Sequence, residues 1–350
     1  MLPDILICDD SEMARKQMAR ALPTALRHQV SFCRNGSEAL AHIRNNVPDL
    51  LFLDLNMPDL DGYEVLAHLR SEQIELLTIV VSGDIQPQAK ARVFSLGAVA
   101  FLNKPTAPSA VAGLLAQYGI YSEPEQPQPS TAPPSGSQPE TDTPSHSANI
   151  NPDLQLLLND YLREIANIAM GRSSDLLARL LGIFVRQPIP KVAFIASSEL
   201  HMTIAAADDE AHYSAVCQGF TGAGVAGEAM LLFADSSFRE MAEMLHYDNL
   251  DGPAVNIEVL MDMSSILFGA FLKGIGDQMD LRLGLSHPTV LGQHRQIAEL
   301  LDHHYNHEQQ LLCIEITYTI ENHNIQCDML VLFTEDSLPF LQQRLQYLAE

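Results

Sequence analysis

The C-terminal part of the chain contains two copies of one sequence pattern, and this repeat restricts the folds open to it. Five positions recur 98 residues later: Asp160 as Glu258, Glu164 as Asp262, Asn167 as Ser265, Gly171 as Gly269 and Pro190 as Pro288. A second match, offset by 100, relates "LLFADSSF" at 231–238 to "VLFTEDSL" at 331–338. Two separate matches at nearly one offset indicate an internal duplication.

Each copy of the repeat has the pattern of a long helix, several strands, and a helix that opens at a "DSS" or "EDS" cap. Either half alone is short for an independent hydrophobic core. We therefore expect residues 151–350 to form a single α+β domain with pseudo-twofold symmetry.

Residues 1–121 follow a different pattern, in which apolar runs alternate with helical segments as five β–α units. The run "DILIC" is continuously apolar after its first residue, and the run "LLFLDL" is continuously apolar up to its Asp. Such runs are typical of parallel strands buried on both faces. This pattern predicts a doubly wound, five-stranded parallel sheet of the α/β class. Its functional site is expected at the carboxyl ends of the strands.

The segment between these two parts, residues 122–150, is rich in Pro, Ser, Thr and Gln. Such a composition has little apolar surface to bury, so we expect a disordered linker that tethers the two domains.

The charge of the chain is concentrated in the C-terminal part. The formal net charge is −24, and residues 153–350 account for −17 of it. A domain this acidic repels phosphate backbones, so we expect no direct binding of nucleic acid.

Other features of the sequence predict a cytoplasmic protein. The five cysteines form no CxxC pair, and the N-terminus lacks the basic flank of a signal peptide. No apolar run approaches the roughly 20 residues of a membrane helix, so membrane insertion is not predicted.

Polar residues stand at the predicted carboxyl ends of the N-terminal strands: Asp9, Asp10, Asp54, Ser82 and Lys104. In a doubly wound sheet these ends converge in one crevice. Three crowded carboxylates repel one another unless a hard cation neutralises them, and Mg2+ suits oxygen ligands. Asp54 can then act as a nucleophile toward a phosphoryl group. Lys104 and the Ser82 hydroxyl can hold the phosphoryl oxygens.

Residues 3–118 closely resemble the receiver domain of response regulators. The resemblance is carried by "DLNMPDLDG" after an apolar strand, by the "DD" pair, and by "GAVAFLNKP". It implies that Asp54 accepts a phosphoryl group from an upstream histidine kinase. It also implies that Asp10 and Asp54 bind Mg2+ directly, Asp9 through water, and Asn56 through its backbone carbonyl.

The same resemblance implies a conformational switch formed by Ser82 and Phe101, which rearranges after phosphorylation. Gly83 departs from the family pattern, in which a small Ala is usual at this position. The departure leaves the chemistry of the pocket in place.

The pattern D-x3-E-x2-N-x22-P from Asp160 to Pro190 resembles the signature of the CheC/CheX/FliY family of chemotaxis phosphatases. This family has two such helices related by pseudo-symmetry. The resemblance implies hydrolysis of aspartyl phosphate on a phosphorylated CheY-like response regulator. Glu164 would then dock on the receiver lysine, and Asn167 would orient the attacking water.

The residue types suit this chemistry. An aspartyl phosphate is already activated, so hydrolysis needs little beyond a water in line with the leaving carboxylate. The amide of Asn167 can both donate to and accept from such a water. Glu164 lies one turn earlier on the same helix face and can pair with a lysine.

The second copy of the motif has Asp262 and Ser265 in place of Glu and Asn. Asp is one methylene shorter, and Ser has no amide. We expect this second site to be catalytically weak or inactive and to be retained for packing.

Two functions remain open from the sequence. The first is a phosphatase of phosphorylated response regulators that is regulated by the receiver domain of the same chain. The alternative is a binding module, in which phosphorylation of Asp54 switches docking on a chemotaxis or flagellar partner without catalysis.

Overall fold

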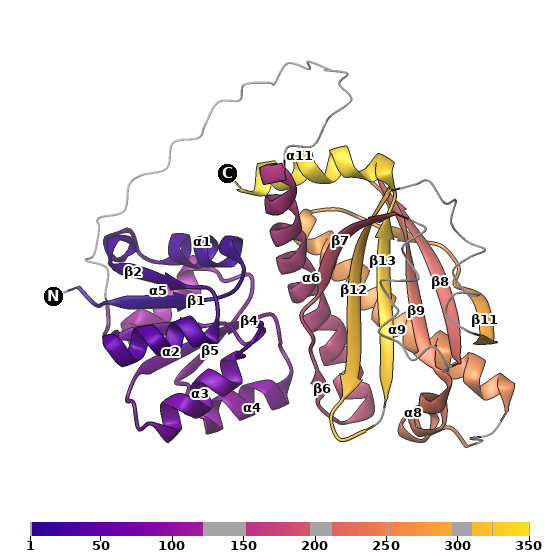
Figure 1. Ribbon diagram of the computed structural model, residues 1–350, viewed down its shortest axis with the longest axis horizontal. Helices are drawn as coiled ribbons and strands as arrows, with labels where there is room; N and C mark the ends of the chain where they lie inside the picture. The colour runs from indigo at the N-terminus through magenta and orange to yellow at the C-terminus, as the bar shows by residue number, and fades with distance from the viewer. Residues whose placement is uncertain are drawn as a thin grey trace, which may run out of the picture.

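The computed structural model describes residues 2–121, 152–196, 212–248, 250, 252–295, 310–323 and 325–349. These residues form an N-terminal and a C-terminal domain that lie side by side and are in contact (Figure 1). The predicted linker at 122–150 lies outside the described residues.

The N-terminal domain is a five-stranded sheet in the order β2-β1-β3-β4-β5, with every pairing parallel. The strands are β1 (Ile5–Cys8), β2 (Val30–Cys33), β3 (Leu50–Leu53), β4 (Leu77–Ser82) and β5 (Ala100–Asn103). The helices are α1 (Glu12–Ala21), η1 (Thr24–Gln29), α2 (Gly36–Asn45), α3 (Gly62–Ser71), α4 (Pro87–Ser95) and α5 (Pro108–Gln117). The predicted doubly wound α/β fold is confirmed.

The alternation of side chains along each strand explains why the strands are continuously apolar. In β1, Leu6 packs with residues of α2 and α3, whereas Ile5 and Ile7 pack with residues of α1 and α5. Helices therefore cover both faces of the sheet, and polar residues are left for the carboxyl ends of the strands.

The C-terminal domain is one eight-stranded sheet in the order β10-β8-β9-β13-β12-β6, with β11 paired to β8 and β7 paired to β12. The strands are β6 (Val185–Arg186), β7 (Lys191–Ala196), β8 (Tyr213–Gly222), β9 (Val225–Ala234), β10 (Gly284–Leu285), β11 (Thr289–Arg295), β12 (Gln310–Ile320) and β13 (Gln326–Phe333). The helices are α6 (Pro152–Leu181), η3 (Asp235–Ser237), α8 (Phe238–Met244), α9 (Pro253–Met279), η4 (Glu335–Ser337) and α11 (Leu338–Ala349).

The predicted pseudo-twofold symmetry is present in the strand register. Strands β9 and β13 pair at the centre of the sheet, where Met230 lies opposite Leu330, its counterpart 100 positions later. The short strands are exchanged between the halves, because β6 and β7 pair with β12, whereas β10 and β11 pair with β8. Neither copy of the repeat can therefore build this sheet alone.

The long helices α6 and α9 pack together over one face of the sheet and form the main core of the domain. The segment Ala254–Met279 of α9 is, among the described residues, the one helix long and apolar enough to cross a membrane by length and composition. The expectation that no segment would reach this length was therefore wrong. Its apolar residues include Val259, Phe268 and Phe271, which are buried in the core, and a buried core helix passes the same test.

Candidate functional site

The carboxyl ends of β1, β3 and β5 bring the predicted acidic residues and the lysine into one pocket. The Lys104 Nζ atom lies 2.7 Å from Asp9 Oδ2 and 3.2 Å from Asp54 Oδ1. Asp9, Asp10 and Asp54 each offer a carboxylate oxygen, and these oxygens lie within 4.8 Å of one another. The backbone N–H of Lys104 donates to the carbonyl of Ser82, which places the end of β4 beside the pocket.

The electrostatics of the pocket are those of a buried acidic cluster. Asp54 is 1% exposed, and apart from the ion pair of its Oδ1 with Lys104, neither carboxylate oxygen accepts a hydrogen bond from the residues that the structure describes. Burial raises the pKa of Asp54 well above its usual range; Lys104 opposes this rise, and Asp9 adds to it. Burial disfavours the charged form of Lys104, but Asp54, Asp9 and Glu164 outweigh this effect and raise its pKa.

This donor set fits the Mg2+ ion that the sequence predicts. The ligands on offer are hard carboxylate oxygens, and one of them, Asp54 Oδ2, has neither a hydrogen bond nor an ion pair among the described residues. A divalent cation beside them would relieve the repulsion among the three carboxylates.

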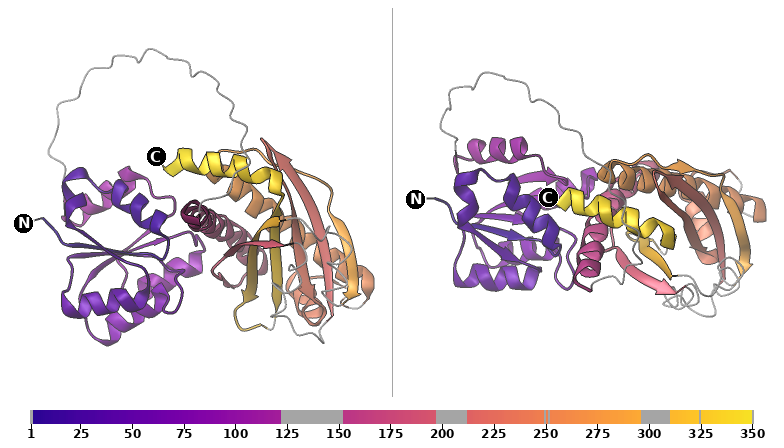
Figure 2. Two further views of the ribbon diagram at one scale, coloured as in Figure 1. Left: turned by 45° about the horizontal axis from the view of Figure 1, so that its top comes forward. Right: turned by 90° about the horizontal axis from the view of Figure 1, so that it is seen from above.

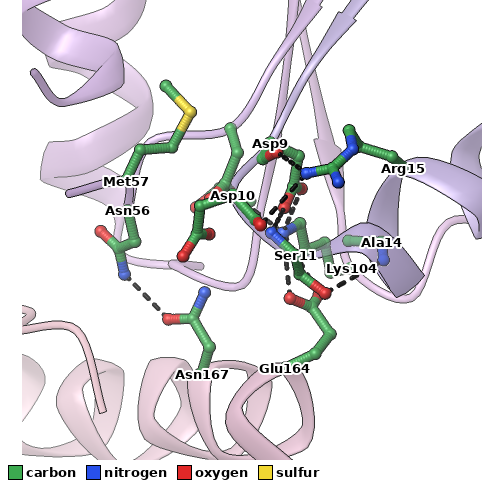
Figure 3. A network of polar contacts seen from close by, with 12 residues as sticks. Asp9, Asp10, Ser11, Ala14, Arg15, Asn56, Met57, Lys104, Glu164 and Asn167 are labelled. Atoms are coloured by element: carbon green, nitrogen blue, oxygen red, sulfur yellow. Dashed lines mark hydrogen bonds and ion pairs between the residues drawn. The ribbon is translucent and has the colours of Figure 1, made fainter. Parts of the chain in front are cut away.

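Helix α6 of the C-terminal domain closes this pocket. Figures 1 and 2 show α6 facing the N-terminal domain. Glu164 and Asn167 project from one face of α6 toward the pocket (Figure 3). Lys104 Nζ lies 3.2 Å from Glu164 Oε1, and the Asn56 side-chain amide donates to Asn167 Oδ1 at 3.0 Å. Glu164 and Asn167 are each only 5% exposed, so the two predicted sites bury each other.

Burial raises the pKa of Glu164 to about 7, while Lys104 opposes this rise and Asp9 adds to it. The Glu164–Lys104 ion pair therefore pays a desolvation cost that offsets much of its Coulomb attraction. A pair of this kind adds little net affinity to the contact between the domains.

Asp160, one turn before Glu164 on α6, makes a second polar contact with the N-terminal domain. Asp160 Oδ2 accepts from the backbone N–H of Met13 at 3.1 Å and from the Ser11 hydroxyl at 3.4 Å. Met13 lies in the first turn of α1, where backbone N–H groups have no partner within the helix. Arg163 Nη2 lies 3.0 Å from Asp160 Oδ1 and 3.3 Å from Asp10 Oδ2. The Asp160 position of the motif is thus a helix-to-helix contact.

The predicted switch residues lie on adjacent strands. Ser82 is fully buried, and its hydroxyl accepts from the backbone N–H of Asp84 at 3.1 Å. Phe101 is half-buried, and Lys90 Nζ lies 5.2 Å from the centre of its ring. The switching role of this pair stays a prediction.

The second motif lies on α9, away from this interface. Tyr247 donates to Asp262 Oδ2 at 2.6 Å, and the Ser265 hydroxyl donates to the carbonyl of Met261 at 2.8 Å. Both side chains line a surface cavity of about 480 Å³ together with Tyr247. Each side chain is engaged within its own domain, and the expected weakness of the second site stays a prediction.

Some interface residues were missed from the sequence. Arg163 lies inside the motif, and its spacing of three from Asp160 was a usable signal for an ion pair on one helix face. Gln86 and Gln187 offered no comparable signal, because each bonds to a residue of the other domain. Gln86 of the receiver bonds to Val185, and Gln187 of the C-terminal domain bonds to Asn56.

Comparison with known proteins supports the interpretation of the N-terminal domain. Residues 5–115 match the family model of the response regulator receiver domain. The N-terminal domain is a response regulator receiver domain. It is of the kind found in two-component and chemotaxis response regulators.

The matches to curated relatives each cover about 30% of this chain. Residues of the receiver are 33% identical over 102 residues to protein-glutamate methylesterase/protein-glutamine glutaminase 3 of Rhodospirillum rubrum, covering 29% of this chain and 28% of that protein. They are 36% identical over 102 residues to the gliding motility regulatory protein of Myxococcus xanthus, covering 29% of this chain and 13% of that protein. The match thus spans less than a third of the length of either relative.

Two solved structures are similar to parts of this chain. Chemotaxis protein CheY4 of Vibrio cholerae is similar with a TM-score of 0.31 and 24% identity, over 33% of this chain and 98% of that chain. FliY of Thermotoga maritima is similar with a TM-score of 0.42 and 15% identity, over 57% of this chain and 99% of that chain.

Proposed function

We propose that the C-terminal domain, residues 151–350, is an aspartyl-phosphate phosphatase for receiver domains, regulated by the receiver at residues 1–121. One observation carries this proposal: Glu164 and Asn167 lie buried against the receiver pocket, with Glu164 on Lys104 and Asn167 beside Asn56. The residues proposed for catalysis thus meet the residues proposed for phosphorylation.

The proposed reaction begins with a phosphoryl group on a carboxylate oxygen of Asp54. The amide of Asn167 holds a water in line with the bond between phosphorus and that oxygen. As the water oxygen bonds to phosphorus, the bond to Asp54 breaks and both electrons stay with the carboxylate. The water's protons leave with inorganic phosphate, and the Asp54 carboxylate returns to its ion pair with Lys104.

Asp9, Asp10 and Asp54 would hold Mg2+. The resemblance to the receiver family implies that the backbone carbonyl of Asn56 would be a further ligand. When bound, the ion would neutralise charge on the phosphoryl oxygens. This chain's own contribution is positional: Glu164 aligns α6 on the lysine, and Asn167 aligns the water. Positioning of this kind supplies several kcal/mol in well-oriented sites, about 7–11 kcal/mol at most.

The docked receiver also supports regulation. Because Glu164 and Asn167 are covered by the receiver of the same chain, a second receiver cannot reach them at the same time. The external substrate would be a phosphorylated CheY-like response regulator, and the phosphoryl donor to Asp54 an upstream histidine kinase. We infer a cytoplasmic setting for both partners.

The alternative is a binding module without catalysis. It is favoured by the Asn56–Asn167 hydrogen bond, which engages the proposed water-orienting oxygen when the receiver is unphosphorylated. Under this alternative the same contacts serve recognition only.

The deciding experiment compares the wild-type chain with the double variant Glu164→Ala, Asn167→Ala. Each is phosphorylated with a small phosphodonor and Mg2+, the donor is removed, and bound phosphate is followed by intact mass. A phosphatase predicts a much longer lifetime of the acyl phosphate in the double variant. Equal lifetimes would leave the binding module as the function.

A further inference from the structure

A loop outside the acidic pocket makes a close contact between the two domains. Residues 83–86 connect β4 to α4 and lie against α6 and β6. The Gln86 side chain donates from Nε2 to the carbonyl of Val185 at 2.9 Å and accepts at Oε1 from the Val185 N–H at 3.0 Å. Gln86 and Val185 are both fully buried.

This pair of hydrogen bonds completes an open sheet edge. Strand β6 ends the strand order of the C-terminal sheet, and Val185 pairs with Ile320 of β12 on its inner side. On the outer side the amide of Gln86 bonds to the Val185 backbone as a further strand would. Without this amide, the backbone N–H and C=O of Val185 would be buried and unpaired.

Two glycines bring the backbones of the loop and α6 together. A Cβ atom on Gly171 would lie 1.9 Å from the carbonyl oxygen of Gly83. A Cβ atom on Gly83 would lie 3.1 Å from the carbonyl oxygen of Asn167 and 3.2 Å from Ile168 Cα. Since the contact falls on the backbone of Asn167 itself, it sets how deeply the Asn167 side chain enters the pocket.

Neither contact involves the acidic residues or Lys104, so both can discriminate between receivers that share the same pocket chemistry. We infer that the loop from Gly83 to Gln86 is a specificity determinant that fits the phosphatase site to the receiver of this chain. It favours receivers with glycine at the position of Gly83 and an amide at the position of Gln86. This inference rests on the proposed function for its kinetic consequence, but not for the docking itself.

The expected effect on docking is large. Removing the Gln86 amide leaves two buried backbone groups unpaired, the N–H and the C=O of Val185. The docking equilibrium of a Gln86→Ala variant should therefore fall about thirtyfold or more. Gln88→Ala is the matched control, because Gln88 is exposed and lies two residues further along the same segment.

Hydrogen exchange on the full-length, unphosphorylated chain tests the docking. In Gln86→Ala the amide of Val185 and the α6 amides near Gly171 should exchange faster, whereas those of β9 and β13 should not change. Gln88→Ala should match the wild type. Wild-type exchange at Val185 in Gln86→Ala would overturn the inference.

A mixing experiment tests specificity with two full-length chains. The substrate chain is phosphorylated Asn167→Ala, Gly171→Ala. It cannot hydrolyse its own phosphate, and its α6 cannot dock its own receiver, because a Cβ at position 171 would lie 1.9 Å from the carbonyl oxygen of Gly83. The other chain is Asp54→Ala, which keeps its α6 site. Adding Gln86→Ala to the substrate chain should lower the rate of dephosphorylation when the substrate chain is dilute. At a saturating concentration of the substrate chain the rate should equal that without Gln86→Ala. Adding Gln86→Ala to the Asp54→Ala chain should raise the rate, because its own receiver then vacates the site.

These opposite signs separate recognition from general destabilisation, which would lower the rate in both arrangements. Lowered rates in both would overturn the specificity role. If no chain hydrolyses phosphate but Val185 still exchanges faster in Gln86→Ala, the phosphatase proposal fails and the docking determinant stands.

Discussion

Replacement of Asn167 by alanine tests the proposed chemistry most directly. Asn167 is 5% exposed and lies one turn after Glu164, and its polar contact across the interface is with Asn56 at 3.0 Å. Losing one neutral hydrogen bond costs about 0.5–1.5 kcal/mol, so docking should weaken about twofold to tenfold. Losing the group that positions the attacking water should slow the chemical step by about a hundredfold, the cost of a misplacement of about 1 Å.

The weaker docking and the slower chemical step can be separated by their size, because docking within one chain is unimolecular and does not depend on protein concentration. We expect the acyl phosphate of Asn167→Ala to outlive that of the wild type by about a hundredfold or more, which exceeds the loss of docking alone. Ser265→Ala is the control from the second motif, since the Ser265 hydroxyl is exposed and bonds only to its own helix, at Met261. Its lifetime should stay within about twofold of the wild type.

The assay phosphorylates each full-length chain with a small phosphodonor and Mg2+, removes the donor, and follows the intact mass over time. Circular dichroism and thermal unfolding establish that each variant is folded. A wild-type lifetime in folded Asn167→Ala would refute the role of its amide. Comparable losses in both variants would show that the second motif is also active.

Three further predictions concern the pocket and the interface. Asp54→Asn should gain no stable phosphate from a small phosphodonor, as measured by intact mass, because its carboxylate is the proposed acceptor. Arg163→Ala should bind Mg2+ about threefold to fivefold more tightly by calorimetry, since the guanidinium 3.3 Å from Asp10 competes for a ligand and a half-exposed pair is worth about 1 kcal/mol. Burial raises the pKa of Asp84 to about 6, with Gln86 opposing and Asp175 adding to the rise. Because Asp175 belongs to the docked domain, docking raises the pKa of Asp84, and its contribution to docking is lost as the pH rises through about 6. Asp84→Asn should therefore flatten the pH dependence of docking across this range, as followed by hydrogen exchange at Val185.

The receiver fold and its pocket could be predicted from sequence because their signals are local. Apolar runs ended by Asp9, Asp54 and Lys104 identify strands, and parallel strands must present their carboxyl ends at one edge. The repeat likewise predicted the symmetric α+β domain, because a duplicated sequence folds into duplicated elements.

The exchange of short strands was not predictable from the repeat. The offset that relates Met230 to Leu330 is equally compatible with two separate half-sheets. Only the observed pairing of β6 with β12 and of β10 with β8 shows that the halves are intertwined. Strand pairing depends on contacts distant in sequence, for which a single sequence carries no periodic signal.

The sequence determined which groups could react. The carboxylate of Asp54, the amine of Lys104 and the amide of Asn167 have the same functional groups wherever they lie in the fold. Only the tertiary structure decided that these groups meet within one chain. That meeting depends on backbone surfaces, the Gly83–Gly171 contact and the Gln86–Val185 hydrogen bonds, whose complementarity spans two domains. Shape complementarity between distant backbones leaves no pattern in residue order, so it becomes visible only when both surfaces are folded.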